Sequence, residues 1–134
     1  MDDMSEKTSG VTASLFPALG YRDARAAADW LERAFGFVRH AVHDGPDGGV
    51  AHAEMRFGNG MVMFGSRRAP DPANPWADSE GVYAVVDDVE GHYARAVAAG
   101  AEILRPLAET PYGAREYTAR DPEGHLWSFG TYRP

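Results

Sequence analysis

The stretch DPEGHLWSFG, residues 121–130, joins a turn to an apolar strand. Asp, Pro, Glu and Gly stand in the order that a type I turn favours, and strand-forming residues follow it. FGNG at 57–60 precedes the apolar run MVMFGS at 61–66 in a similar way. Asn59-Gly60 predicts a two-residue hairpin turn in which both residues need positive φ. We therefore expect two β-hairpins, one in each half of the chain.

The segments before the two hairpins also correspond. Pro17 disfavours a helix over 14–21 because proline lacks an amide hydrogen, so we predict a strand there. Asp23 is placed to cap a helix in which Ala27, Trp30, Leu31, Ala34 and Phe35 form an apolar stripe and which Gly36 ends. The other predicted elements are strands at 37–43, 50–57, 61–66, 81–86, 101–106, 114–119 and 125–132, and a second helix that Asp87 or Asp88 caps and Gly100 ends.

Three landmarks recur at one spacing, which indicates a duplicated unit. The pairs separated by 64 residues are Asp23 and Asp87, Gly36 and Gly100, and Gly60 and Gly124. We predict one α+β domain over 13–134, built from two βαβββ modules at 13–65 and 81–132. A proline-rich linker at 66–80 joins the modules, and a tail at 1–12 lies outside the fold. The alternative is an unrelated α+β domain whose turns coincide by chance.

Composition and charge narrow the class of protein. Of the 134 residues, 44% are hydrophobic and 25% charged, as in ordinary globular domains. A net charge of -7 argues against binding to nucleic acids or to anionic membranes, and it is compatible with cationic or neutral partners. The chain has no cysteine, which excludes disulfides, thiolate zinc sites and a cysteine nucleophile. Its acidic N-terminus and lack of a long apolar run lead us to expect a cytoplasmic protein.

Residues 14–132, and the segment from Asp87 through DPEG to Phe129 most specifically, resemble the vicinal oxygen chelate superfamily. This family comprises glyoxalase I, extradiol dioxygenases, fosfomycin-resistance enzymes and bleomycin-resistance proteins. The resemblance implies that each module curls into half of a cup. It also implies that two modules, often from different subunits of a homodimer, enclose a cleft for a small molecule. The family's enzymes hold a divalent metal there through His, Gln or Glu at four places.

Matched residue by residue, this sequence departs from the metal-binding pattern. The four places fall on Phe16, Phe64, Gly81 and Ser128, and Glu80 is the one potential ligand if the register slips by one residue. A catalytic metal needs about three protein donors, so we expect no metal and no cofactor. We expect Phe16 and Phe64 to make the cleft apolar instead. The resemblance is then closest in character to metal-free members of the bleomycin-resistance type.

Polar residues on two strands are further candidates for the cleft. In VAHAEMRF, His52 and Glu54 share one strand face, while Ala53 and Met55 share the face that should meet the helix. The 64-residue spacing places Glu116 and Thr118 at corresponding positions, and we include these four with Ser128 among the ligand-binding candidates. His52 and Glu54 are weak candidates for a proton-transfer pair. The alternative is a row of ion pairs on a solvated sheet face.

The tryptophans and the remaining histidines divide by context. We expect Trp30 and Trp127 to lie in the core, whereas Trp76 in the linker has no apolar stripe around it and is a candidate to cover the cleft or to contact a second subunit. Tyr83, Tyr112 and Tyr117 are weaker ligand-binding candidates. His40 and His43 should lie on opposite strand faces and His92 on the exposed side of its helix, so that, with His125, they are interpreted as surface residues.

Two functions follow as hypotheses. The first is a homodimeric, antibiotic-resistance-like protein that sequesters a small apolar or cationic molecule without a metal. The second is an enzyme, either a metal-dependent lyase or dioxygenase, or a metal-free isomerase that uses His52 and Glu54. A module that binds a partner, with the cleft filled by side chains, is a third possibility. We expect no nucleotide binding, because no glycine-rich phosphate loop opens a helix, and no nucleic-acid partner, because the net charge is -7.

Overall fold

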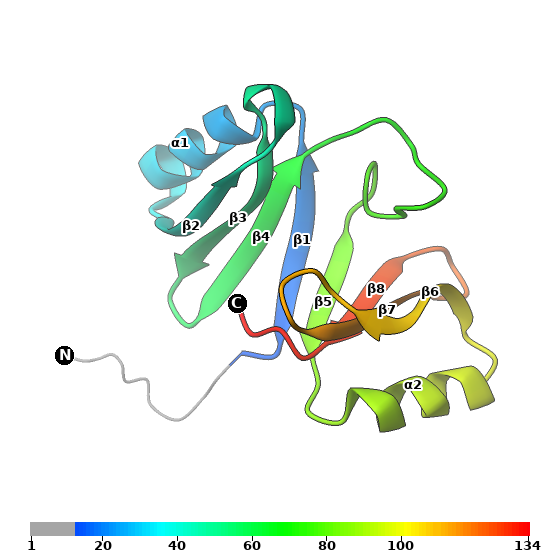
Figure 1. Cartoon of the computed structure of the whole chain (residues 1–134). Helices are drawn as coiled ribbons and strands as arrows, with labels where there is room; N and C mark the ends of the chain where they lie inside the picture. Colours follow the sequence, from blue (N-terminus) through cyan, green and yellow to red (C-terminus); the bar gives the residue numbers. More distant parts are fainter. Residues whose placement is uncertain (1–12) are drawn as a thin grey trace.

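Two copies of one βαβββ order follow each other in the chain (Figure 1). The computed structural model describes residues 13–134, so the tail predicted for 1–12 lies outside the described residues. The elements are β1 (Leu15–Tyr21), α1 (Ala24–Phe35), β2 (Val38–Asp44), the 3-10 turn η1 (Pro46–Gly48), β3 (Val50–Phe57), β4 (Gly60–Ser66), β5 (Gly81–Val85), α2 (Val89–Ala98), β6 (Glu102–Glu109), β7 (Arg115–Arg120) and β8 (Leu126–Gly130). The predicted α+β class is confirmed.

The strands form one curved, open sheet of eight in the order β2-β3-β4-β1-β5-β8-β7-β6. β1 pairs with β4 in parallel and with β5 antiparallel, so β1 and β5 join the two halves. Pro17 fits β1 because its partner there is Val82 on β5, while the β1–β4 ladder begins only at Ala18. Figure 1 shows α1 against the first half and α2 beside the second.

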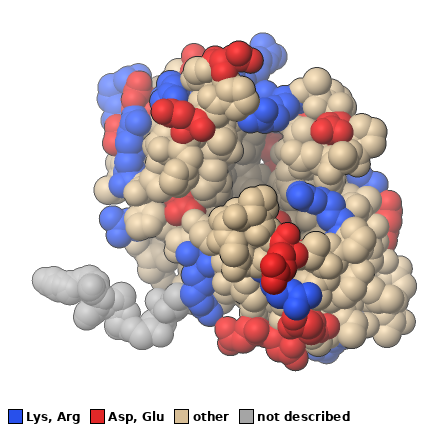
Figure 2. Space-filling view, viewed as in Figure 1, with Lys and Arg blue, Asp and Glu red and all other residues tan. Residues whose placement is uncertain are grey.

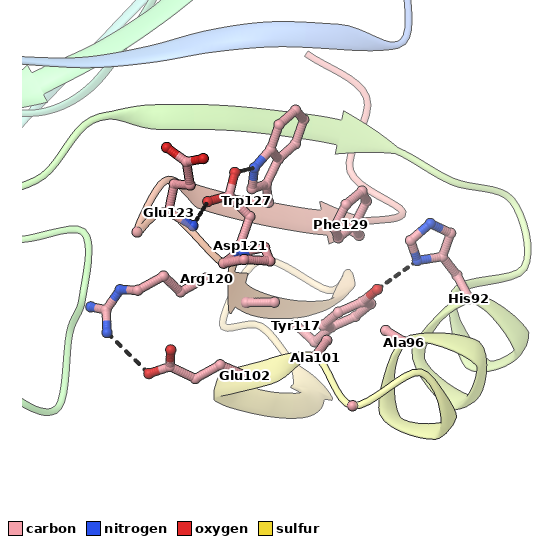
Figure 3. Close-up of a pocket in the computed structure, with 14 residues that line it drawn as sticks. His92, Ala96, Ala101, Glu102, Tyr117, Arg120, Asp121, Glu123, Trp127 and Phe129 are labelled. Atoms are coloured by element: carbon pink, nitrogen blue, oxygen red, sulfur yellow. Dashed lines mark hydrogen bonds and ion pairs between the residues drawn. The ribbon is translucent and has the colours of Figure 1, made fainter.

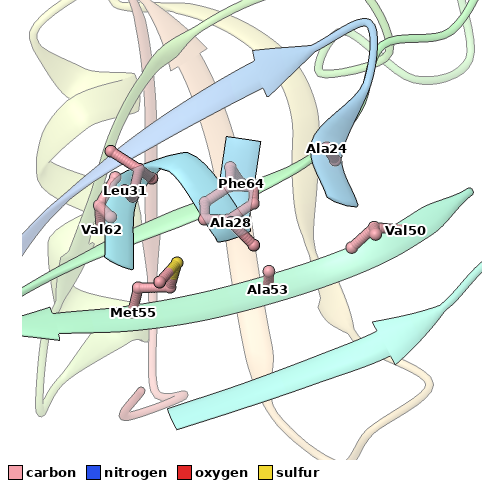
Figure 4. Close-up of a cluster of buried hydrophobic side chains, with 8 residues drawn as sticks. All are labelled: Ala24, Ala28, Leu31, Val50, Ala53, Met55, Val62 and Phe64. Carbon is pink, nitrogen blue, oxygen red and sulfur yellow. The ribbon is translucent and has the colours of Figure 1, made fainter. Parts of the chain in front are cut away.

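The core of the first half lies between α1 and the sheet (Figure 4). Ala24, Ala28 and Leu31 of α1 are buried against a cluster formed by Val50, Ala53, Met55, Val62 and Phe64. The predicted stripe is therefore wrong for Trp30 and Phe35, which are 46% and 55% exposed and pack on each other with ring centroids 4.5 Å apart. The small side chains of α1 allow its backbone to approach the sheet closely, which turns the two large rings outward.

Both helices begin at aspartates. Asp23 accepts a hydrogen bond from the amide of Ala26, and Asp88 accepts one from the amide of Gly91. Asp88, and not Asp87, is thus the counterpart of Asp23, so the caps are 65 residues apart. Gly36 ends α1 in the left-handed conformation that a glycine adopts without strain, with φ of 75°.

The first hairpin turn lies one residue earlier than predicted. Phe57 pairs with Gly60, so the two turn residues are Gly58 and Asn59, and Gly60 is the first residue of β4. Only Gly58 of this pair has positive φ. In the second hairpin, Arg120 pairs with Leu126, which leaves five residues in the loop. The two hairpins therefore differ in loop length.

This difference changes which residues correspond on β4 and β8. Glu54 pairs with Met63, whereas Thr118 pairs with Ser128. Met63, and not Phe64, is thus the counterpart of Ser128. Because adjacent strand residues point to opposite faces, a shift of one residue moves the predicted side chain to the other side of the sheet.

The described part of the chain contains no helix that is long and apolar enough to cross a membrane.

Candidate functional site

A cavity of about 630 Å³ lies on the inner face of the sheet, between the two halves, and we call it the cup. The space-filling view shows a hollow between two lobes, with acidic and basic side chains interspersed around it (Figure 2). Its walls come from both modules, the linker and the C-terminal segment, and they include Ala18, His43, His52, Met63, Ser66, Arg67, Arg68, Trp76, Tyr83, Tyr112, Glu116, Ser128 and Tyr132.

The linker enters the cup through Trp76. Its indole Nε1 donates a hydrogen bond of 2.9 Å to the hydroxyl oxygen of Ser128 on β8. That hydroxyl is also hydrogen-bonded to the Thr118 hydroxyl on β7 at 2.6 Å. Thr118 and Ser128 are both buried, so this chain of hydrogen bonds holds the indole ring against one wall. The structure thereby brings together three of the predicted ligand-binding residues.

Glu54 lies at the centre of a second polar cluster. Its carboxylate is 2% exposed and accepts from the Tyr132 hydroxyl. His52 Nε2 is 2.8 Å from the same carboxylate oxygen, and the His52 side chain is 37% exposed on the cup side. Glu54 therefore orients His52 and Tyr132 from behind, while the cavity itself is bordered by these two rings.

Glu116 borders the cavity from β7, where burial raises the pKa of its carboxyl group. Tyr112 donates to Glu116 Oε1 at 3.1 Å. Burial, followed by the charge of Glu116, raises the pKa of Tyr112 to about 12, so this phenol remains protonated at neutral pH. The second module thus presents a carboxyl group with one neutral hydrogen-bond donor beside it.

Aromatic side chains from three segments form one wall. Phe16 on β1 is 6% exposed and packs with Met63 and Tyr83, beneath the surface of the cavity. The Tyr83 hydroxyl donates to the backbone oxygen of Tyr132 at 2.6 Å, which fixes the C-terminal segment across the wall. Tyr112 and Tyr132 meet edge to face, with ring centroids 5.5 Å apart.

The side chain of Phe64 packs mainly on the face of the sheet that meets α1, and not on the face of the cup where we expected it. Phe64 borders the cavity, but its ring belongs to the α1 cluster and packs edge to face on Tyr21, with centroids 5.4 Å apart. Met63 projects toward the cup in its place, because the two hairpins differ in pairing register by one residue. A flexible thioether side chain therefore stands where a second phenyl ring was expected.

The four positions that the resemblance matches to metal ligands, with Met63 now in the place of Phe64, do not suit a divalent metal. Phe16 and Met63 offer no hard donor, and the Ser128 hydroxyl is already bonded to Trp76 and Thr118. At Gly81, an added Cβ would lie 2.2 Å from the Leu126 carbonyl oxygen and 2.9 Å from the Trp76 ring, so no ligating side chain fits.

Glu80 does not replace the missing ligand. Its carboxylate is 2.9 Å from the Arg67 guanidinium and accepts from the amide of Gly20 at 3.3 Å, so it is held in an ion pair at the linker. Among residues 13–134, no group of three or more His, Asp or Glu side chains is arranged to hold a metal.

His40 and His43 are exposed, as predicted, but they do not diverge to opposite strand faces, and His92 is only partly exposed. A register shift in β2 lets His40 Nε2 approach Glu54 Oε1 to 3.8 Å, while His43 stacks on His52, so both reach the same polar cluster. His92 faces the sheet, where its Nδ1 is 2.6 Å from the Tyr117 hydroxyl. His125 lies at the exposed end of the β7–β8 loop, as predicted.

Tyr132 is the site residue that sequence reasoning missed. The predicted strand over 125–132 included Tyr132, whereas β8 ends at Gly130. Alternation from Ser128 along that predicted strand is the signal that could have pointed Tyr132 toward the cup. Met63 was missed because the hairpins were assumed to be of equal length.

Comparisons with known proteins place the chain among related sequences and folds. A family model described as Glyoxalase/Bleomycin resistance protein/Dioxygenase superfamily matches residues 15–129. An uncharacterized protein of Mycobacterium bovis is 31% identical over 127 residues, which cover 90% of this chain and 84% of that relative.

Two solved structures share the fold. A superfamily member from Vibrio splendidus 12B01 has a TM-score of 0.67 at 19% identity, covering 87% of this chain and 96% of that chain. Methylmalonyl-CoA epimerase from Mycobacterium tuberculosis has a TM-score of 0.68 at 14% identity, with coverages of 96% and 93%.

Proposed function

The chain belongs to the glyoxalase/bleomycin resistance protein/dioxygenase superfamily, and from this premise we propose that it binds a small, cationic aromatic molecule in the cup without a metal. The observation that carries the proposal is the Trp76 ring, which occupies the space beside Gly81 and is anchored to Ser128. An aromatic ring thus lies at the place where the metal-dependent enzymes of this family hold their metal ion.

The chemistry of the walls supports a cationic, flat ligand. Trp76, Tyr83, Tyr112 and Tyr132 offer ring faces and edges, and such rings attract cations by about 0.5–2 kcal/mol each. Glu116 supplies a carboxyl group within the same cavity, which is also bordered by Arg68 and by Arg67, whose charge is paired with Asp78 and Glu80. The net charge of -7 adds a favourable long-range field for a cation.

Sequestration is the role that we propose for this binding. A protein that holds an antibiotic in a closed cup confers resistance by lowering the free drug concentration, with no chemical step. It protects only targets in its own compartment, and we propose the cytoplasm. We also propose a homodimer, supported by the apolar side chains of Trp30, Phe35, Val38 and Phe57 at the exposed end of the first module.

Isothermal titration tests the proposal. The protein is treated with a chelator and titrated with a panel of cationic aromatic antibiotics that includes bleomycin. We expect saturable heat at one ligand per cup, a loss of at least tenfold in affinity for Trp76→Ala, and no change for Val97→Ala, which is exposed on α2 and borders neither the cup nor the proposed dimer surface. If no compound in the panel produces heat or quenches Trp76 fluorescence, sequestration of this class is refuted.

A second candidate function rests on the pair of His52 and Glu54. The 2.8 Å contact between His52 Nε2 and Glu54 Oε2, with His52 open to the cup, is the geometry of an oriented general base. A metal-free isomerase would then exchange a carbon-bound substrate proton with solvent. Deuterium incorporation into a panel of 2-substituted acids, lost in His52→Gln and retained in His125→Gln, would favour this function over sequestration.

A further inference from the structure

A second cavity, of about 950 Å³, lies on the outer face of the sheet beside α2, and we call it the α2 pocket (Figure 3). It is separated from the cup by the sheet itself, because Trp127 and Phe129 alternate with Ser128 along β8. Ser128 faces the cup, whereas Trp127 and Phe129 line the α2 pocket.

The pocket exists because the two helices pack differently. α1 buries Ala24, Ala28 and Leu31, whereas Val89 is the buried residue of α2. α2 packs mainly on β6 and β7 and reaches β8 at Phe129 through His92, which leaves the outer face of β8 open beside Trp127. Small residues at the helix side, Ala96 and Ala101, keep the space beneath α2 open.

The floor of the pocket is a continuous aromatic surface. The rings of Trp127 and Phe129 are nearly parallel, at 7°, with centroids 6.3 Å apart. His92 lies on Phe129 at 4.3 Å, and Tyr117 lies 5.3 Å from the same ring. A flat, rigid surface of this kind suits stacking by a planar ring.

The polar groups around the floor are already paired with one another. The Trp127 indole N–H donates to Asp121 Oδ2 at 3.1 Å, which fixes the ring. His92 Nδ1 and the Tyr117 hydroxyl are hydrogen-bonded, and Arg120 pairs with Glu102. The pocket therefore offers ring faces and methyl groups to a ligand more than hydrogen-bond partners.

The rim determines the charge that a ligand can carry. Glu102, Asp121 and Glu123 bring three carboxylates to it, against the single guanidinium of Arg120. An anion would be repelled there. We propose that the α2 pocket is a second small-molecule site, independent of the cup, for a planar aromatic compound without negative charge that stacks on Trp127 and Phe129.

The three tryptophans allow a test that separates the two cavities. Trp127 lies in the α2 pocket, Trp76 in the cup and Trp30 on the surface, so the protein labelled with 5-fluorotryptophan has one fluorine in each place. Resonances are assigned from the three Trp→Phe variants. The probe is quinoline near neutral pH, where it is uncharged, and naphthalene-2-sulfonate is its anionic comparator.

We expect quinoline to shift the Trp127 resonance saturably and to bind more tightly at this place than the anion does. Ala96→Phe fills the pocket and should weaken the Trp127 response at least tenfold. Ala94→Phe, on the exposed side of the same helix, adds the same ring and should leave the response unchanged. If Ala96→Phe shifts the Trp30 and Trp76 resonances before quinoline is added, the substitution disturbs the fold. Ala96→Leu, which fills the pocket with a smaller side chain, then replaces it.

Three results would overturn the second site. One is a Trp127 resonance that does not move. Another is a shift of equal affinity in the filled variant, and the third is a change confined to Trp76, which would mean that quinoline enters only the cup. Trp76 is the tryptophan that reports on the cup. A negative result at Trp127 would therefore refute the second site without refuting the proposed function, which the calorimetric titration tests separately.

Discussion

Ser128 is the residue through which the linker is attached to the second module. Its hydroxyl accepts from Trp76 and is bonded to Thr118, and both neighbours are in part or fully buried. Loss of this hydroxyl would leave the indole N–H without its acceptor. The wall of the cup therefore depends on one hydrogen bond between residues that are 52 positions apart in the chain.

Ser128→Ala should lower the free energy of unfolding by about 1–3 kcal/mol, because it leaves a buried donor unpaired. A double-mutant cycle with Trp76→Phe isolates the hydrogen bond, and we expect a coupling free energy of about 0.5–1.5 kcal/mol. Urea unfolding monitored by circular dichroism measures it. Strict additivity of the two substitutions would show that the bond contributes nothing.

Glu116 makes stability depend on pH. Burial raises the pKa of its carboxyl group above the ordinary value of 4.5, so the folded state holds the proton more tightly than the unfolded state. The contribution of this group to stability is therefore fully present below pH 4.5 and is lost as the pH rises through the folded pKa.

Glu116→Gln should consequently raise the urea midpoint at pH 7, and this gain should shrink as the pH falls through the folded pKa of Glu116 and be absent below pH 4.5. The glutamine oxygen can still accept from Tyr112, so the hydrogen bond is a shared feature of both proteins. Urea midpoints of both proteins measured from pH 4 to pH 8 test this prediction. Glu109→Gln, on the exposed edge of the sheet, is the control. A destabilised variant at pH 7 would contradict the assigned pKa shift.

Among the elements, α1 is attached to the sheet by a narrower face than its apolar periodicity predicts. Leu31 is 7% exposed, whereas its neighbour Trp30, which was also predicted to lie on the buried stripe, is 46% exposed. Leu31→Ala should cost about 2–5 kcal/mol of unfolding free energy. Trp30→Ala should cost less than about 1 kcal/mol, and thermal unfolding of the two variants compares them. A larger loss for Trp30 would restore the predicted stripe.

The start of α2 provides a matched pair of neighbours. Asp88 accepts from the amide of Gly91, while the Asp87 side chain is 96% exposed. Asp88→Ala should lower the free energy of unfolding by about 0.5–2 kcal/mol, as expected for a lost cap. Asp87→Ala should change it little. If the two substitutions lowered the free energy of unfolding equally in chemical denaturation, Asp88 would not be the stabilising cap of α2.

For the whole molecule, the central prediction concerns metal. If the cup holds no metal, extensive chelation should leave both the thermal midpoint and the heat of ligand binding unchanged. A resident metal present at 100 times its Kd would add about 2.7 kcal/mol, which a chelator would remove as a fall of several degrees in the midpoint. Such a fall, reversed by zinc or nickel, would favour the metal-dependent enzymes instead.

The positions of particular residues show why the candidate site was predicted only in part. His52 and Glu54 were placed on the correct strand face, since alternation along β3 needs only the local sequence. Phe64 was placed on the wrong face because the correspondence between β4 and β8 was carried across hairpins of different length. Trp76 lies outside regular elements, where no period relates a side chain to a direction.

The amino-acid sequence by itself determined the order of elements, the Asp23 cap of α1, the glycine that ends α1 and the duplicated βαβββ module. These features follow from local periodicity and from backbone preferences within a few residues. Only the tertiary structure decided which side chains meet in the cup and that a second pocket opens beside α2. Those outcomes depend on how far apart the packed elements lie and on a one-residue shift in pairing register between the two hairpins. In a strand, such a shift is enough to exchange the inner and outer faces.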